Sequence, residues 1–335
     1  MELDELSQRL VPFCQAHLDD LDVRVENVEK APGHAGFSYF FDAVTKGRRE
    51  RFFLRLPPPN VRYVGIADVL RQATILKALD GTGVPHAPVL WSGDDEQWFG
   101  RPYFVVPRLD GDVLRPAPDD WHAALPHETR RWMSQQAMQA LAEIHRLDWE
   151  QKCPSLGPPV PFDEDVTRWD RLFERSEEAH YLRKWPEVRQ KLLDTIPGDT
   201  RIGVFHGDFQ WSNLLYARDG TLLAVIDWEL VGIGATLNDV GWIVTFNDPS
   251  AWAHPGGGGN GLMGGPEDFV EMYIEAFGSD PGGINWYRAL AAYKFASISG
   301  FNLMLHRRGK RPDPAWENMA PSMESLMEYA LRMLG

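Results

Sequence analysis

The 335-residue chain contains little cysteine, since Cys14 and Cys153 are its two thiols. Two cysteines are too few for a disulfide framework or a cysteine-rich zinc site. Long apolar runs are also missing, because none approaches the roughly 18 residues that a membrane-spanning helix needs. The opening stretch MELDELSQRL is charged and lacks the basic and apolar regions of a secretory signal. We therefore expect a cytoplasmic protein with no membrane partner.

Positive charge is scarce as well. The 34 Lys and Arg residues face 48 Asp and Glu residues, which gives a formal net charge of -14. Such a chain repels a phosphate backbone, so nucleic acid is not an expected partner, and a cationic ligand is only slightly favoured. The 44% hydrophobic content supplies enough apolar area for sizeable cores, which excludes a disordered or fibrous chain. Nothing in the composition indicates an oligomeric state.

The first 107 residues predict a small β-rich lobe. Apolar residues at helical spacing predict helices over about residues 1–20 and 67–79. Two β-rich runs, 37–44 and 49–56, flank a Thr45-Lys46-Gly47 turn and predict a hairpin. Further strands are expected at 84–91 and 101–109.

The remainder of the chain, residues 108–335, predicts a larger and mainly helical lobe. Helical periodicity marks 128–149, 166–193, 266–277, 284–305 and 315–334. Short β segments interrupt it at 201–208, 213–217 and 222–228. We interpret the glycine-rich segment 254–266 as a surface loop. The predicted fold class is α+β, with lobes at 1–107 and 108–335.

The segment VFHGDFQWSNLLYARDGTLLAVIDWE, residues 204–229, carries the chemistry. Asp219-Gly220 predicts a hairpin turn that places Asn213 opposite Ile226 or Asp227. An amide oxygen and a carboxylate at the mouth of one hairpin suit Mg²⁺, which takes few protein oxygens and keeps positions for phosphate and water. Asp208 precedes the first strand of this hairpin and can serve as an ionised general base. Together these groups describe a phosphoryl-transfer site.

Three motifs resemble one family. HGDFQWSN (206–213) resembles the H-G-D-x-x-x-x-N catalytic loop of the aminoglycoside phosphotransferase and choline kinase superfamily. VIDWE (225–229) resembles the magnesium-binding segment of that family, and GIGATLNDVGW (232–242) resembles the stretch that follows it. The runs LRLPPP and GHAGFSYFF are similar to bacterial members named aminoglycoside phosphotransferases, a group that also resembles the kinase-like domain fused to some acyl-CoA dehydrogenases. The resemblance implies a bilobal protein-kinase-like fold.

The same resemblance implies roles for the residues of these motifs, with ATP and Mg²⁺ as cofactors. Asp208 would accept the proton of the substrate hydroxyl as it attacks the γ-phosphate. Asn213 and Asp227 would bind magnesium. His206 would be architectural, and Asp239 would anchor the catalytic loop by hydrogen bonds. Glu229 receives no role.

In the first lobe, the resemblance implies a phosphate-covering turn, a phosphate-pairing cation and an interlobe hinge whose backbone meets adenine. These cofactor-binding residues are Gly33, Gly36, Ser38, Arg55, Val105, Val106 and Pro107. Gln72 stands where the family usually has the glutamate that supports the cation. A neutral amide forms weaker hydrogen bonds than a carboxylate does, so this position predicts looser nucleotide positioning.

The sequence thus predicts a kinase that phosphorylates a hydroxyl of a small molecule, with an aminoglycoside as acceptor. A hydroxyacyl thioester or an amino alcohol is the alternative acceptor, and the thioester would use the basic run HRRGKR at 306–311. A nucleotide-binding module with little catalysis is a further alternative, motivated by Gln72. A protein kinase is disfavoured, because the loop has HGD in place of HRD and no A-P-E segment follows.

Overall fold

The computed structural model describes residues 2–32, 37–115, 117, 119–198, 200–253 and 261–335. The chain divides into two compact units. The N-terminal unit comprises residues 1–110 together with 227–231, and the C-terminal unit comprises 111–226 together with 232–335. The short segment 227–231 therefore packs with the N-terminal unit although it lies far along the chain. The lobe boundary at residues 107 and 108 stays a prediction.

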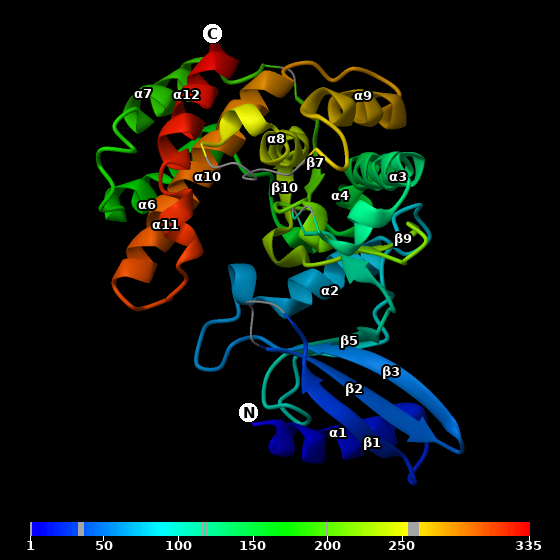
Figure 1. The fold of residues 1–335 in the computed structure, drawn as a ribbon. Coiled ribbons are helices and arrows are strands. Elements are labelled where there is room, and N and C mark those ends of the chain that lie inside the picture. The colour runs from blue at the N-terminus through cyan, green and yellow to red at the C-terminus, as the bar shows by residue number, and fades with distance from the viewer. Residues whose placement is uncertain (1, 33–36, 116, 118, 199, 254–260) are drawn as a thin grey trace. The chain divides into compact units, whose positions relative to one another are not determined.

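The N-terminal unit is built on one five-stranded antiparallel sheet (Figure 1). In spatial order its strands are β1 (Arg24–Lys30), β2 (Ser38–Thr45), β3 (Arg48–Arg55), β5 (Tyr103–Pro107) and β4 (Trp91–Gly93). The predicted hairpin is confirmed, since β2 and β3 pair from Ser38 and Arg55 down to Thr45 and Arg48. Lys46 and Gly47 form its turn with positive φ angles of 38° and 85°.

Two helices complete this unit. Helix α1 (Leu3–Leu18) was predicted, and its buried Leu6, Leu10 and Phe13 join the apolar core of the sheet. The Phe13 ring meets the ring of Tyr103 edge-on at a centroid distance of 5.4 Å. Helix α2 (Val69–Ala78) begins at Asp68, whose carboxylate accepts two backbone N–H groups of its first turn.

The strand predicted at residues 84–91 is wrong. Strand β4 begins only at Trp91, because Pro85 and Pro88 lack the N–H groups that a sheet requires. Strand β1 escaped prediction, since its alternation is weak and a register shift between Glu26 and Glu29 interrupts its pairing.

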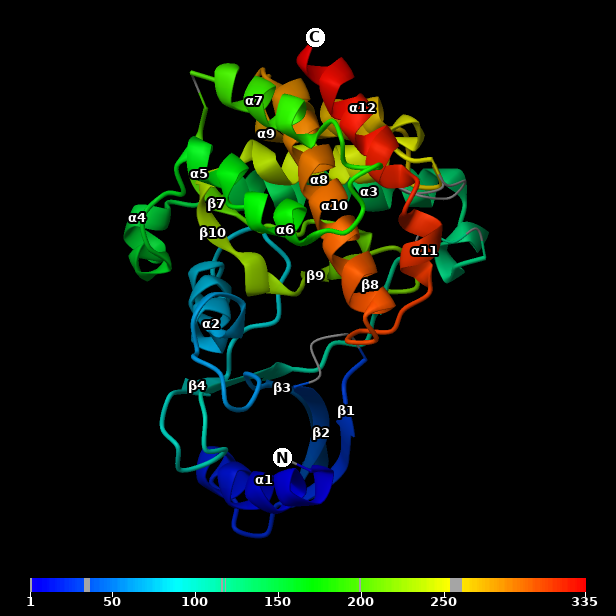
Figure 2. The same ribbon diagram turned by 90° about the vertical axis from the view of Figure 1, so that its left-hand side faces the viewer.

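The C-terminal unit is mainly helical. Its longer helices are α3 (His127–Arg146), α7 (Trp185–Asp194), α8 (Leu237–Phe246), α9 (Pro266–Phe277), α10 (Ile284–Arg307) and α12 (Ser322–Leu334). Its shorter ones are α4 (Trp149–Lys152), α5 (Phe162–Thr167), α6 (Asp170–Arg175) and α11 (Ala315–Met319). Figure 2 shows α10 running through this unit, and it packs against both α8 and α12.

Close approach of α8 and α10 depends on Gly241. A Cβ atom at this position would lie 2.4 Å from the backbone carbonyl of Tyr287, so any side chain would force the helices apart. The helices expected at 266–277 and 284–305 are confirmed. The stretch 166–193 is not one helix, because α5, α6 and α7 are separated by turns.

Two small sheets flank the loop that carries Asp208. β7 (Ile202–Phe205) pairs with β10 (Gly232–Ala235), and β8 (Leu214–Tyr216) pairs with β6 (Asp112–Val113) and β9 (Leu222–Val225). Leu214 lies opposite Val225, and the Ile226 N–H donates to the Asn213 carbonyl at 2.9 Å. The predicted hairpin register is therefore confirmed. No helix in the described part of the chain combines the length and apolarity needed to cross a membrane.

Candidate functional site

Asp208 lies in the loop between β7 and β8, where its carboxylate accepts several hydrogen bonds. The Asn213 amide nitrogen donates to Oδ2 at 2.9 Å, and the Trp242 indole N–H donates to Oδ1 at 3.0 Å. The Gln210 amide nitrogen lies 2.8 Å from Oδ1 and 2.9 Å from Oδ2. The side-chain partners that these two oxygens have among the described residues are all hydrogen-bond donors.

His206 is fully buried and holds the backbone of this loop. Its Nδ1 accepts the Asp208 N–H at 3.2 Å, which leaves the proton on Nε2 to donate to the Ile226 carbonyl at 3.0 Å. The imidazole thereby ties the start of the loop to the far strand of the hairpin. These contacts are the ones that an architectural role requires.

Asp239, in the first turn of α8, fixes the same loop from the other side. Its carboxylate accepts the backbone N–H groups of His206 at 2.6 Å and Gly207 at 2.8 Å. Gly207 has a φ of 89°, a conformation that residues with side chains rarely adopt. The contacts are those that the resemblance implies for an anchoring carboxylate.

Behind Asp239 lies His145, at the end of α3. Its Nε2 is 3.4 Å from Asp239, and its Nδ1 is 2.7 Å from the Tyr273 hydroxyl. Complete burial lowers the pKa of His145, and the nearby Asp239 offsets only part of this effect. A neutral His145 therefore donates to Asp239 and accepts from Tyr273.

An aromatic cluster that includes Trp242 adjoins Asp208. The Trp242 indole stacks on Phe295 of α10 at a centroid distance of 3.9 Å, and Phe295 also contacts Trp252 and Phe246. The half-exposed residues of α10 continue from Phe295 through Ile298 at helical spacing. Helix α10 contains no Asp or Glu. The side of α10 that carries Phe295 and Ile298 is therefore apolar.

In the N-terminal unit, Arg55 ends β3 beside the segment 227–231. Its guanidinium donates to the Ser38 hydroxyl at 2.8 Å and to Glu229 at 2.9 Å, and it lies 4.0 Å from Asp227. Glu229 is thus the carboxylate partner of Arg55. Sequence reasoning missed it, because no local pattern links residues so distant in the chain.

Gln72 lies buried on α2, and its amide nitrogen has no hydrogen-bond partner among the described residues. No hydrogen bond joins it to Arg55 in the described structure, so its supporting role stays a prediction. The adjacent Arg71 donates from Nε to the Val231 carbonyl at 3.1 Å. Helix α2 therefore holds the segment 227–231 through Arg71.

Asp227 has a left-handed backbone, with φ 62° and ψ 60°. Aspartate tolerates this conformation better than most residues, and such conformations concentrate at functional sites. The carboxylate of Asp227 and the amide oxygen of Asn213 are hard ligands of the kind that Mg²⁺ takes, with water and phosphate completing its shell. No group of three His, Cys, Asp or Glu suitable for a metal occurs among the described residues, and the magnesium-binding roles of Asn213 and Asp227 stay predictions.

The remaining predicted nucleotide contacts lie in the N-terminal unit. Val105 and Val106 pair with Leu54 and Phe53 of β3. The Val105 carbonyl also accepts the N–H of Leu90 at 2.9 Å. Pro107 ends β5. Gly33 and Gly36 of the predicted phosphate-covering turn lie outside the described residues.

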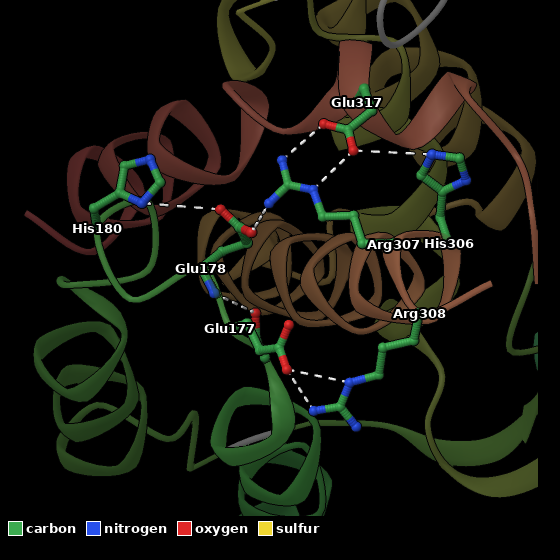
Figure 3. A network of polar contacts seen from close by, with 8 residues as sticks. Glu177, Glu178, His180, His306, Arg307, Arg308 and Glu317 are labelled. Carbon is green, nitrogen blue, oxygen red and sulfur yellow. Dashed lines mark hydrogen bonds and ion pairs between the residues drawn. The ribbon is translucent and has the colours of Figure 1, made fainter. Parts of the chain in front are cut away.

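Two arginines of the basic run 306–311 pair with glutamates (Figure 3). Arg307 bonds to both oxygens of Glu317 at 2.7 Å and also pairs with Glu178. Arg308 pairs with Glu177. A hollow of about 450 Å³ beside this network is lined by Phe301, Leu305 and Lys310, with Met304, Arg308 and residues 174–177. The run is therefore a weaker anion site than its sequence predicts.

Comparison with protein families decides the assignment. The profile of the phosphotransferase enzyme family, named APH, matches residues 29–290. The chain belongs to this family. Its fold is the bilobal kinase-like α+β fold that the sequence predicted, and the resemblance to aminoglycoside phosphotransferases is confirmed.

The chain is similar in sequence to acyl-CoA dehydrogenase family members and similar in structure to aminoglycoside phosphotransferases. Mouse acyl-CoA dehydrogenase family member 11 is 26% identical over 265 residues, which are 75% of this chain and 33% of that protein. The chain spans about a third of the length of this relative. A Ralstonia eutropha structure provisionally named an aminoglycoside phosphotransferase is 21% identical, with a TM-score of 0.79 over 97% of this chain and 98% of that one. Aminoglycoside phosphotransferase APH(4)-Ia, in complex with ADP and hygromycin B, is 13% identical with a TM-score of 0.62 over 95% and 96%.

Proposed function

We propose that this phosphotransferase moves the γ-phosphate of ATP, in the presence of Mg²⁺, to an alcohol hydroxyl of a small molecule. The observation that carries the proposal is the catalytic loop, in which Asp208 is surrounded by donors and bound to the Asn213 side chain at 2.9 Å. His206 and Asp239 hold the backbone of that loop. Family membership supports transfer of phosphate, and the nucleotide in the APH(4)-Ia complex supports ATP.

In this mechanism Asp208 takes the proton of the acceptor hydroxyl as its oxygen attacks the γ-phosphorus. The bond to the β-phosphate oxygen breaks, and ADP leaves with that electron pair. Asn213 and Asp227 would hold magnesium, which supplies neutralisation of the charge that develops on the phosphates. Arg55 would pair with the phosphates, oriented by Glu229 and Ser38.

The alternative of a nucleotide-binding module rested on Gln72, the neutral residue at the usual glutamate position. Arg55 has a carboxylate partner without it, because its guanidinium donates to Glu229 at 2.9 Å. We therefore favour a catalytic phosphotransferase over a module that only binds nucleotide.

The acceptor class has two candidates. The solved structures named above favour an aminoglycoside. A hydroxyacyl thioester is favoured by the acyl-CoA dehydrogenase relatives and by the apolar wall of Trp242, Phe295 and Ile298, which suits an acyl chain better than a polycation. Arg307 and Arg308 pair with glutamates, and Arg175 and Lys310 are further cations of the nearby hollow that could meet an anionic tail.

Incubation with Mg-ATP and single compounds, followed by mass spectrometry, tests the proposal. The panel contains aminoglycosides, amino alcohols and hydroxyacyl thioesters. We expect one compound class to gain the mass of one phosphate while ADP appears in equal amount. Tight Mg-ATP binding without transfer to any of them would favour the binding module instead.

A further inference from the structure

The hydrogen-bond acceptor sites of the Asp208 carboxylate are all occupied in this conformation. Oδ1 accepts from Gln210 and Trp242, and Oδ2 accepts from Gln210 and Asn213. A carboxylate offers about four acceptor sites, two on each oxygen. A substrate hydroxyl must donate to one of them before its proton can transfer. One of the three donors must therefore leave when an acceptor binds.

Two of the three donors are fixed. Trp242 is buried and stacked on Phe295, so its indole cannot turn without breaking that contact. Asn213 is buried, and its amide nitrogen also donates to the Asp208 carbonyl at 2.8 Å. Neither side chain can move away cheaply.

Gln210 differs from both. Its side chain is half-exposed, and the two bonds that its amide nitrogen makes in the described structure both end on Asp208. One nitrogen lies at nearly equal distances, 2.8 and 2.9 Å, from the two carboxylate oxygens. A hydroxyl oxygen that approaches the base from solvent would take the same position.

We propose that Gln210 is a placeholder for the acceptor hydroxyl. Its amide nitrogen occupies acceptor sites of the Asp208 carboxylate until an acceptor displaces it. While ATP is bound, it keeps water from that position. The inference rests on the proposed function, because it takes Asp208 as the base. It makes Gln210 a specificity-determining residue that suppresses wasteful hydrolysis.

The reaction that Gln210 would suppress is the hydrolysis of ATP. With water as the acceptor, Asp208 takes a proton from water, the water oxygen bonds to the γ-phosphorus, and the bond to ADP breaks. The products are ADP and inorganic phosphate. Removal of the Gln210 amide opens the base to water, so this reaction should accelerate.

The test measures ADP release from Mg-ATP without any acceptor. Gln210→Ala and the similarly sized Gln210→Met should each release ADP roughly tenfold faster than wild type, the factor expected for one lost bond to a charged group. Asp208→Asn combined with Gln210→Met should release ADP more slowly than wild type. Gln139→Ala, which changes an exposed glutamine on α3, should leave the rate unchanged.

A second readout examines the contact without nucleotide. In ¹⁵N-labelled protein, the side-chain amide signal of Gln210 is assigned by its loss in Gln210→Met, and it should shift in Asp208→Ala but not in Gln139→Ala. An unshifted signal overturns the proposal, and so do folded Gln210 variants whose ADP release equals that of wild type. Failure of the proposed function gives a different pattern, since Asp208→Asn would then release ADP as fast as wild type.

Discussion

Arg55 and Glu229 form an ion pair at 2.9 Å although they stand 174 positions apart in the chain. The contact lies within the N-terminal unit, and both side chains are largely shielded from solvent, with 12% and 31% exposed. Arg55 also holds the Ser38 hydroxyl. Glu229 thus gives the proposed phosphate-binding guanidinium a fixed direction.

Glu229→Gln should weaken Mg-ATP binding by about tenfold, because a neutral amide loses the charge-assisted bond that orients Arg55. Isothermal titration calorimetry measures this dissociation constant. Glu26→Gln is the matched control, since Glu26 on the edge strand β1 pairs with Arg49 on β3 of the same sheet. Equal weakening by both variants would show that overall charge, not the Arg55 contact, controls binding.

Asp239→Asn should loosen the catalytic loop. The amide would offer N–H groups toward one of the two backbone donors, His206 and Gly207, that the carboxylate now accepts. We expect a loss of about 2–4 kcal/mol in the free energy of unfolding, since both bonds end on a buried carboxylate. Urea denaturation followed by circular dichroism measures it. A variant as stable as wild type would remove the anchoring role from Asp239.

The pH dependence of stability should report on His145. Burial lowers its pKa, so the folded protein binds this proton less tightly than the unfolded chain, whose histidine titrates near 6.5. The corresponding stability is complete above about pH 6.5 and is lost as the pH falls below that value. His145→Gln removes this group, so its urea midpoint should fall less between pH 8 and pH 5 than the wild-type midpoint does. An equal fall of the urea midpoint in both proteins across this range would contradict the lowered pKa of His145.

A buried ion pair should stabilise the C-terminal unit around α10. The Lys294 ammonium lies 3.2 Å from the Asp165 carboxylate, and Asn238 donates to the same carboxylate at 2.7 Å. Lys294→Met alone should cost about 1–3 kcal/mol, because Asp165 loses this buried partner but keeps Arg168, whose guanidinium lies 2.6 Å from the same carboxylate. The double variant Lys294→Met, Asp165→Leu should recover most of that loss. Additive losses measured by urea denaturation would argue against coupling of the two residues.

The sequence predicted those features that depend on local patterns. The Asp219-Gly220 turn and the apolar runs beside it determine the register that places Asn213 opposite Ile226, and the structure confirms that register. The helices at 266–277 and 284–305 follow from their apolar spacing alone. The apolar content of residues 84–91 predicted a strand that does not form, because Pro85 and Pro88 lack the N–H groups that a sheet needs.

The features that the sequence did not predict depend on contacts between distant segments. Nothing near Glu229 indicates that its partner is Arg55, and nothing in the helical pattern of α8 indicates that the Trp242 indole reaches Asp208. Such contacts form only when the chain folds, because burial and packing then determine where these side chains point. The roles of Asp208, Asn213 and Asp227 follow from motif resemblance and stay predictions.

The most direct test of the central claim compares phosphate transfer by wild type and Asp208→Asn, once the mass-spectrometric panel has identified an acceptor. Single-turnover transfer from γ-labelled ATP should fall by at least about 10²-fold, the contribution typical of a general base. Mg-ATP affinity should stay within about twofold of wild type, and Asp227→Ala should lose both transfer and nucleotide binding. Transfer by Asp208→Asn at the wild-type rate would contradict the account, because Asp208 would then not be the base.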